Sequence, residues 1–248
     1  MMRKTLLIAA LALAASLEPL MAQQKATVDE LYLTPEEVPN AVLWLPAPPE
    51  PGSTQFTHDI NQYYWGKAQR LDSARAQKAI REAEYRVKQM AEQFSEAFGM
   101  AISETATPAI FRVLNRSVLT IRLSASKPKQ TYMRLRPYVR FQEPTLVPAE
   151  EPGLRYTGSY PSGHTVRGWG MALLLSEINP DRQDELFRLG YEWGQSRVIA
   201  GFHWQSDVDA SRMLAAATYA RLHACQAFLD DMAAARREFQ QLSAAARK

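Results

Sequence analysis

Apolar residues recur every three or four positions along much of the chain after residue 86, and no stretch alternates regularly between apolar and polar. Val87, Met90, Phe94 and Phe98 share one helical face, and Gly99 follows as a typical helix stop. A second stripe near the C-terminus consists of Phe228, Met232, Ala235, Phe239 and Leu242. Since strands require a period of two, the sequence predicts an all-α fold made of one compact helical domain.

Helix boundaries are marked by capping residues and prolines. Thr107 followed by Pro108 predicts an N-cap and first turn, opening a helix to about Leu123. Further helices are expected over residues 127–136, 165–178, 181–200 and 205–223. Pro137 ends the first of these, and Asn179-Pro180 ends the second. Between residues 138 and 160, prolines and a glycine break every period, which predicts a loop.

The first 55 residues depart from the helical pattern. A basic start, an apolar run over Leu6–Leu17 and small residues up to Ala22 are typical of a signal peptide over residues 1–22, cleaved after Ala22. This predicts a periplasmic or secreted protein; a retained membrane anchor is the alternative. Residues 23–55 contain six prolines and predict an extended arm. The helical domain is expected over residues 56–248.

Composition excludes several classes of function. The chain has 248 residues and a formal net charge of +3, too small to indicate a nucleic-acid partner. No apolar run after the N-terminal one is long enough to predict a membrane span. Cys225 is the single cysteine, so an intrachain disulfide is impossible. Apolar helix faces could serve a core or a homo-oligomer interface.

The first candidate cluster is basic. Lys129 and Arg136 stand seven residues apart in KQTYMRLRP, so on one helix they would lie two turns apart on the same face and could reach one anion. Arg134 and Arg140 add local charge. Taken alone, such a run is more often a solvated helix face.

The second cluster lies in GSYPSGHT, residues 158–165. A turn containing Ser162 and Gly163 that feeds a helix exposes backbone N–H groups, where the helix dipole adds partial positive charge. Such a turn suits phosphate, and His164 would stand at its mouth as a titrating group. Taken alone, such a stretch is more often a capped helix start with a surface histidine than a catalytic site.

The third cluster lies in SRVIAGFHWQSD, which contains Arg197, His203 and Asp207. The i, i+4 spacing lets the Asp207 carboxylate hold one ring nitrogen of His203. The other nitrogen then keeps a lone pair and can act as a nucleophile. Taken alone, a His–Asp pair at this spacing is more often structural.

Together the three clusters supply what phosphoryl transfer needs: cations for the equatorial oxygens, a nucleophile and an acid for the leaving oxygen. The sequence contains no HExxH, CxxC or paired-Asp motif. We therefore expect a reaction with no metal and no cofactor.

The ordered motifs Lys-x6-Arg-Pro, Pro-Ser-Gly-His and Ser-Arg-x5-His-x3-Asp resemble the three-part signature of the type-2 phosphatidic acid phosphatase superfamily. Within it, the stretches YMRLRP, GSYPSGHT, SEINP and GYEWGQSRVIAGFHWQSD are similar to the secreted class A bacterial non-specific acid phosphatases. The likeness covers nearly all of the chain after residue 22.

The resemblance implies roles for these residues. His203 would form a phosphohistidine, Asp207 would orient it, and His164 would protonate the leaving alcohol. The phosphoryl oxygens would be bound by Lys129, Arg136, Arg197, Ser162 and Gly163. In this scheme His164 begins protonated and His203 begins neutral, which accounts for an acid optimum.

Expected substrates are small phosphate monoesters such as nucleotides, sugar phosphates and aryl phosphates. Phosphate and vanadate would inhibit, and phosphoryl transfer to other alcohols would be a side activity. Tyr156, Tyr160 and residues 31–33 are candidate pocket contacts, with ordinary packing as the alternative. His58 and His223 are expected to lie outside the site.

Two other functions remain open at this point. A vanadate-dependent haloperoxidase could use the same site, since vanadate mimics the phosphoryl transition state. A periplasmic protein that binds phosphate esters without turnover would belong to a different class, but it would not require a His–Asp pair facing a second histidine.

Overall fold

The computed structural model describes residues 31–246, and within this range it is helical with no strand. The helices are α1 Thr54–Gln69, α2 Ser73–Arg81, α3 Val87–Phe98, α4 Pro108–Leu123, α5 Ser126–Tyr132, α6 Pro137–Phe141, α7 Glu151–Leu154, α8 Gly163–Ile178, α9 Gln183–Ile199, α10 Gln205–Leu222 and α11 Gln226–Ala246. The all-α prediction is confirmed.

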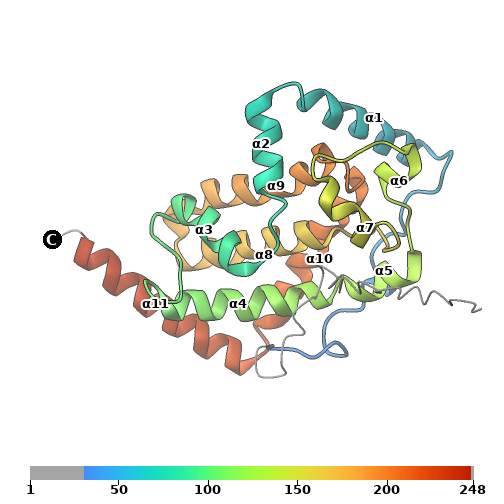
Figure 1. Cartoon of the computed structure of the whole chain (residues 1–248). Coiled ribbons are helices and arrows are strands. Elements are labelled where there is room, and N and C mark those ends of the chain that lie inside the picture. The colour runs from blue at the N-terminus through green and yellow to red at the C-terminus, as the bar shows by residue number, and fades with distance from the viewer. Residues whose placement is uncertain (1–30, 247–248) are drawn as a thin grey trace, which may run out of the picture.

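Helix α8 forms the centre of the fold. It packs against α9, α10 and α4, while α11 lies along the outer side of α4 (Figure 1). Apolar side chains cover most of its circumference, as expected for a helix enclosed by others; Val166, Met171, Leu174 and Leu175 are fully buried. This packing fixes the N-terminal end of α8, which carries the second motif.

The expected helix boundaries agree closely with α3, α4, α9 and α10. Gly99 adopts φ +89° directly after α3, a left-handed conformation that favours glycine over other residues. Thr107 precedes α4, but its side chain does not cap that helix; its hydroxyl instead donates to the Ala101 carbonyl. Thr107 therefore occupies the N-cap position, but the prediction that its side chain caps the helix was wrong.

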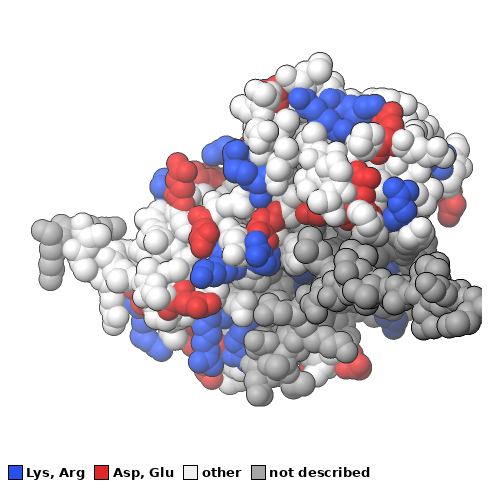
Figure 2. Space-filling view, viewed as in Figure 1, with Lys and Arg blue, Asp and Glu red and all other residues white. Residues whose placement is uncertain are grey.

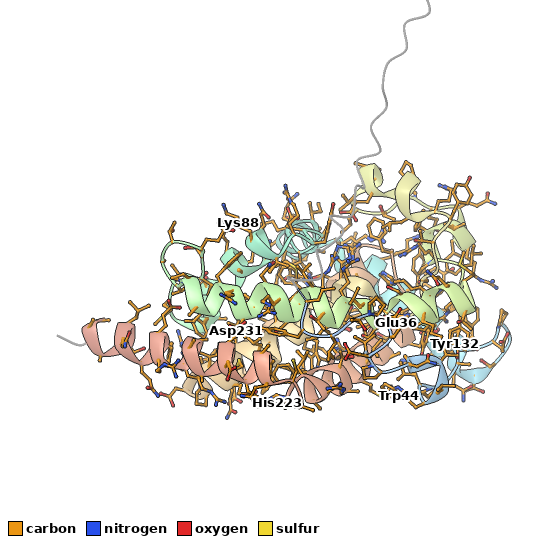
Figure 3. All side chains as sticks on the ribbon, turned by 90° about the horizontal axis from the view of Figure 1, so that it is seen from below. Glu36, Trp44, Lys88, Tyr132, His223 and Asp231 are labelled. Atoms are coloured by element: carbon orange, nitrogen blue, oxygen red, sulfur yellow. The ribbon has the colours of Figure 1, made fainter. Side chains whose placement is uncertain are left out.

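Helix α11 packs through the expected stripe. Phe228, Met232 and Ala235 are buried, and the Phe239 ring lies 5.4 Å from the Phe98 ring. Leu242, at the end of the stripe, is 38% exposed. Figure 3 shows α11 running beside α4, with Asp231 between them.

Residues 31–53 cross the helices with one short 3₁₀ turn, Ala41–Leu43. Tyr32 packs edge-on against Phe228, and its backbone N–H donates to the Thr120 hydroxyl. Further along, the Pro46 carbonyl accepts a hydrogen bond from the Tyr160 hydroxyl. Figure 3, in which the molecule is seen from below, labels Glu36 and Trp44 of this segment. Residues 1–30, which include the expected signal peptide, lie outside the described residues.

The expected helix over residues 127–136 was too long. Helix α5 ends at Tyr132, and Met133 follows with φ 41°. Arg136 is extended, with φ −73° and ψ 151°, because a residue before proline disfavours the helical conformation. Residues 138–160 also contain the short helices α6 and α7, so they are not loop throughout.

Acidic and basic side chains interleave over the visible face of the molecule (Figure 2). Within the described part of the chain, no helix is both long enough and apolar enough to cross a membrane.

Candidate active site

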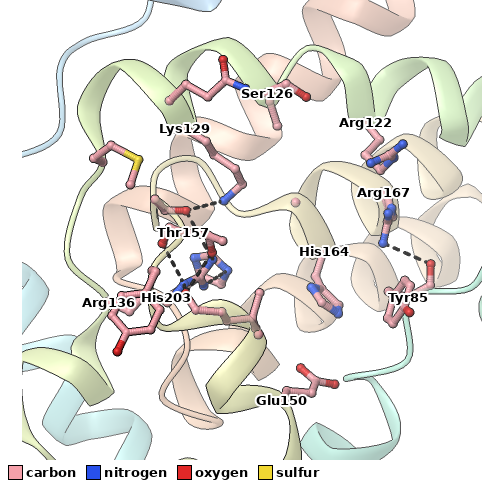
Figure 4. Close-up of a pocket in the computed structure, with 18 residues that line it drawn as sticks. Tyr85, Arg122, Ser126, Lys129, Arg136, Glu150, Thr157, His164, Arg167 and His203 are labelled. Atoms are coloured by element: carbon pink, nitrogen blue, oxygen red, sulfur yellow. Dashed lines mark hydrogen bonds between the residues drawn. The ribbon is translucent and has the colours of Figure 1, made fainter. Parts of the chain in front are cut away.

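A cavity of about 500 Å³ opens at the N-terminal end of α8, between α5, α7 and the segment after α2 (Figure 4). Its lining is formed by Tyr85, Arg122, Ala125, Ser126, Lys129, Gln130, Met133, Arg136, Glu150, Gly153, Leu154, Tyr156, Thr157, Gly158, Gly163, His164, Arg167 and His203. The three motifs, separated by tens of residues in the chain, meet here. The volume suits a small organic molecule.

His203 lies in the turn between α9 and α10 and is almost completely buried. Its Nδ1 lies 3.3 Å from Asp207 Oδ2, and its Nε2 lies 3.1 Å from Arg136 Nη1. A guanidinium can only donate hydrogen bonds, so we assign the lone pair to Nε2 and the hydrogen to Nδ1. The nitrogen at the cavity is thus the nucleophilic one.

Burial lowers the pKa of His203 well below its ordinary value, and the nearby Arg136 charge lowers it further. The interaction with Asp207 opposes this shift without reversing it. The surroundings of His203 therefore favour its neutral form, which is the state that a nucleophile requires.

Asp207 is fully buried and has hydrogen-bond donors on both oxygens. Arg134 Nη1 donates to Oδ1 at 2.6 Å, and the Trp204 N–H donates to Oδ2 at 2.9 Å. The Ser159 hydroxyl donates to Oδ2 as well. Burial alone would raise the Asp207 pKa, but Arg134, His203 and Ser159 outweigh it, and the pKa is lowered. The carboxylate thus stays charged beside His203.

Arg136 and Lys129 form one wall of the cavity. Arg136 is buried; its guanidinium also donates to the Phe202 and Leu154 carbonyls and to the Thr157 hydroxyl. Burial lowers its pKa to about 10, which leaves it charged. Lys129 and Arg136 both line the cavity, but they do not share one helix face. Lys129 lies on α5, whereas Arg136 lies in the extended segment that follows it.

Lys129 Nζ donates to the Gly158 carbonyl at 2.9 Å. A Cβ atom at Gly158 would lie 2.3 Å from the Lys129 carbonyl oxygen, so a larger residue would push the two segments apart. Burial, then the Arg136 charge, lower the Lys129 pKa well below its ordinary value. An anion beside this ammonium would act in the opposite direction.

Ser162 and Gly163 start α8 as expected. The Ser162 side chain is buried, is absent from the cavity lining, and accepts a hydrogen bond from the Thr165 N–H as the N-cap. The Gly163 and His164 N–H groups have no acceptor among residues 31–246. The turn therefore presents free donors at the cavity, while the Ser162 hydroxyl serves the helix.

His164 lies in the cavity wall, and its Nε2 donates to the Ala83 carbonyl at 2.8 Å. Burial lowers its pKa well below the ordinary value, and the charges of Arg197 and Arg167 add to that shift. The protein's own groups therefore favour neutral His164, contrary to the expectation that it begins protonated. Nδ1 would need to gain a proton before His164 could donate one.

Arg197 is fully buried behind Glu150, which accepts a hydrogen bond from Nη2 at 3.3 Å, and Arg197 is itself absent from the cavity lining. Its Nε and Nη1 have no partner in the described part of the chain. Unsatisfied buried donors are costly, so these groups are suited to an anion. Burial lowers the Arg197 pKa, and Glu150 partly offsets this.

The family model described as "PAP2 superfamily" matches residues 100–230 of this chain, a range that includes all the predicted catalytic and phosphate-binding residues. A non-specific acid phosphatase of Providencia stuartii is 40% identical over 215 residues, covering 86% of both chains. One from Salmonella typhimurium is 42% identical over 209 residues, covering 84% of this chain and 83% of the relative. An acid phosphatase of Zymomonas mobilis is 33% identical over 80% of this chain and 75% of the relative.

This chain belongs to the PAP2 superfamily, among the class A bacterial acid phosphatases.

Sequence reasoning missed several residues of this PAP2 site. Arg134 was noted only as added charge, yet it bridges Asp207 and Asp59, both fully buried. Ser159, within the second motif, binds Asp207 rather than substrate. Glu150 comes from a segment expected to be loop. Arg134 and Glu150 contact residues that are distant in the sequence, so no local pattern could predict their roles. Only Ser159, which lies within a recognised motif, could have been predicted as a site residue.

Of the two tyrosines predicted as candidate pocket contacts, only one lines the cavity. Tyr156 lines the cavity and is 82% exposed, whereas Tyr160 is buried against the chain segment at Pro46. Residues 31–33 pack on α4 and α11, away from the PAP2 site. His58 and His223 are exposed and also lie outside it.

Proposed function

We propose that this acid phosphatase hydrolyses small phosphate monoesters through a phosphohistidine at His203, without a metal ion. The observation that carries the proposal is the pair of contacts on the His203 ring. Arg136 assigns the lone pair to Nε2 at the cavity, and Asp207 holds the opposite nitrogen. The names of the relatives support phosphate ester hydrolysis as the reaction class.

In the first step, the phosphoryl group lies against Lys129 and Arg136, which line the cavity, and against the free N–H groups at the start of α8. Arg197, buried behind the lining with Nε and Nη1 unpartnered among the described residues, adds positive charge and donors from behind. These donors supply the positive charge that a metal supplies in other phosphatases. The His203 Nε2 lone pair forms the bond to phosphorus, and the ester P–O bond breaks. The leaving oxygen takes a proton from His164, while Asp207 stabilises the charged ring of His203.

In the second step, neutral His164 takes a proton from water, and the water oxygen attacks phosphorus. The P–N bond breaks, its electron pair returns to Nε2, and phosphate leaves. The His164 pKa must therefore rise when substrate binds. A phosphate dianion near this ring offsets the Arg197 and Arg167 charges that lower the pKa, so binding and protonation are coupled.

Secretion to the periplasm, with cleavage after Ala22, is part of the same proposal and rests on the sequence of residues 1–22. The cavity, open at Tyr156 and Gln130, supports broad specificity, because much of the leaving group would lie in solvent. An alcohol that replaces water in the second step would accept the phosphoryl group, which gives the proposed side activity.

The test is p-nitrophenyl phosphate hydrolysis by the purified protein at mildly acidic pH with excess EDTA, beside His203→Ala. Turnover that survives EDTA and disappears in the variant supports the proposal. Turnover abolished by EDTA, or retained by the variant, overturns the nucleophile assignment. Tight phosphate binding without turnover would favour the binding-protein alternative, and bromide oxidation with vanadate and peroxide would favour the haloperoxidase.

A further inference from the structure

Two arginines that the proposed reaction does not use face the far side of the same cavity. Arg122 is in the last turn of α4, and Arg167 is in the first turn and a half of α8. Figure 4 shows Lys129, Arg136 and His203 grouped at one side of the cavity and these two arginines at the other, with His164 between the groups.

Neither arginine has a carboxylate partner among residues 31–246, whereas Arg116, Arg134 and Arg197 each have one. The Arg122 side chain makes no hydrogen bond to the described residues, and its Nε is buried and unpartnered. Arg167 makes one, from Nη1 to the Tyr85 carbonyl at 3.1 Å, and its buried Nε is also unpartnered.

The two positive charges act on each other. The charge of Arg122, after the larger effect of burial, lowers the pKa of Arg167 to about 9. Burial lowers the Arg122 pKa too. A guanidinium keeps its charge in proteins, so the protein holds two mutually repelling cations at a cavity wall. Leaving such donors without an anion costs free energy.

The two anion sites are close enough for one small molecule. Arg167 follows Gly163 by four residues on α8, which is about 6 Å along the helix axis. On the other wall, Ser126 in the first turn of α5 stands between Lys129 and Arg122 in the chain, and it also lines the cavity. The cavity of about 500 Å³ spans both ends.

We propose that Arg122 and Arg167 form a second anion subsite, which selects phosphate monoesters that carry another phosphate group on the same small molecule. Two guanidinium groups match the dianionic charge of such a group and can bind it through paired N–H donors. The subsite deepens the proposed function, on which it rests, by naming a substrate class: bisphosphate esters whose reacting phosphate lies at His203 and whose distal phosphate lies at the arginines.

The test uses α,ω-alkanediol bisphosphates of two to six carbons, each beside the alkyl monophosphate of equal length. Phosphate release near neutral pH gives the ratio of kcat/KM for the two compounds. The ratio is expected to exceed about tenfold at one chain length and to fall at shorter and longer ones, since two fixed sites require one spacing. A general attraction of charge would instead give a ratio that is insensitive to length, which overturns the proposal.

The variants are Arg122→Gln and Arg167→Gln, singly and together, with Arg237→Gln as the matched control. Arg237 is an exposed residue of α11, remote from the cavity, and its loss changes the net charge equally. The ratio is expected to fall about tenfold in each single cavity variant, and to be unchanged in the control. An unchanged ratio in the double variant contradicts the subsite.

A binding measurement separates this proposal from the proposed reaction. Calorimetric titration of the wild-type protein with non-hydrolysable alkane bisphosphonates and alkyl phosphonates needs no turnover. Tighter bisphosphonate binding at one length, lost in the double variant, supports the subsite even if hydrolysis fails. Hydrolysis of the monophosphates with no preference in either measurement removes the subsite and leaves the proposed function in place.

Discussion

Arg134 Nη1 donates to Asp207 Oδ1 at 2.6 Å, while its Nη2 donates to Asp59 Oδ2 at the same distance. One guanidinium therefore neutralises two fully buried carboxylates, of which one holds His203. This contact connects the stability of the fold to the charge state of the site.

Arg134→Gln should reduce both stability and activity. It leaves Asp207 and Asp59 buried without their cation, which costs about 3–5 kcal/mol of unfolding free energy. Without Arg134 the Asp207 pKa also rises, so activity is lost at a higher pH on the acid side. Urea unfolding and a kcat–pH profile measure the two effects. Arg140→Gln, at an exposed cation over the Phe56 ring, should cost at most about 1 kcal/mol; equal losses in both variants would contradict the account.

Ser159→Ala should lower kcat and leave KM nearly unchanged. Ser159 is fully buried, does not line the cavity, and donates to Asp207 Oδ2, so it positions the carboxylate without touching substrate. Loss of one hydrogen bond to a charged group corresponds to about a tenfold fall in kcat. Steady-state kinetics with p-nitrophenyl phosphate provides the measurement. A changed KM at constant kcat would show that Ser159 acts on binding instead.

Glu150→Gln should tighten inhibition by inorganic phosphate. Glu150 lines the cavity and holds Arg197 at 3.3 Å, so its negative charge opposes a bound dianion. Removing that charge should lower the phosphate inhibition constant about three- to tenfold. Glu104→Gln, at an exposed residue outside the cavity, makes the same change in net charge and should have no effect. Weaker inhibition in Glu150→Gln would mean that its hold on Arg197 matters more than its charge.

Stability should fall as the pH drops below about 6.5, the ordinary pKa of histidine. The pKa values of His164 and His203 are lowered in the folded protein, so the unfolded chain binds protons that the folded one does not. The free energy of unfolding then falls by up to about 1.4 kcal/mol per pH unit for each histidine. Asp207, whose pKa is also lowered, adds a further loss below its ordinary value near 3.9.

Denaturant unfolding of the wild type and of His164→Gln over this pH range tests whether the buried histidines cause the pH dependence of stability. The variant can still donate to the Ala83 carbonyl, and it should lose about half of the slope between mildly acidic and neutral pH. An identical slope in both proteins would show that His164 does not contribute.

Local sequence patterns predicted what depends on local geometry. The period of three to four identified α3, α4, α9, α10 and α11, and the i, i+4 spacing placed Asp207 beside His203. The end of α5 was missed, although Pro137 already restricts Arg136 to an extended conformation. The two residues therefore do not lie on one helix face as predicted, although both line the cavity.

Contacts between distant segments could not be predicted from the sequence. Asp59 and Arg134 are 75 residues apart, and nothing near either residue specifies the other. The same holds for Arg122 and Arg167, since only the folded structure shows that both line one cavity without a carboxylate partner among residues 31–246. The protonation state of His164 depends on burial and on Arg197 and Arg167, so the local motif could not reveal it.

The most direct test of His203 as the nucleophile is to trap the covalent intermediate. The protein is mixed with a labelled aryl phosphate for less than one turnover and quenched in base, where a phosphorus–nitrogen bond survives, and the label is located by peptide mass spectrometry. We predict one phosphoryl group on His203, formed in the presence of EDTA. A label on another residue, or a burst of released alcohol with no phosphorylated peptide, would contradict it.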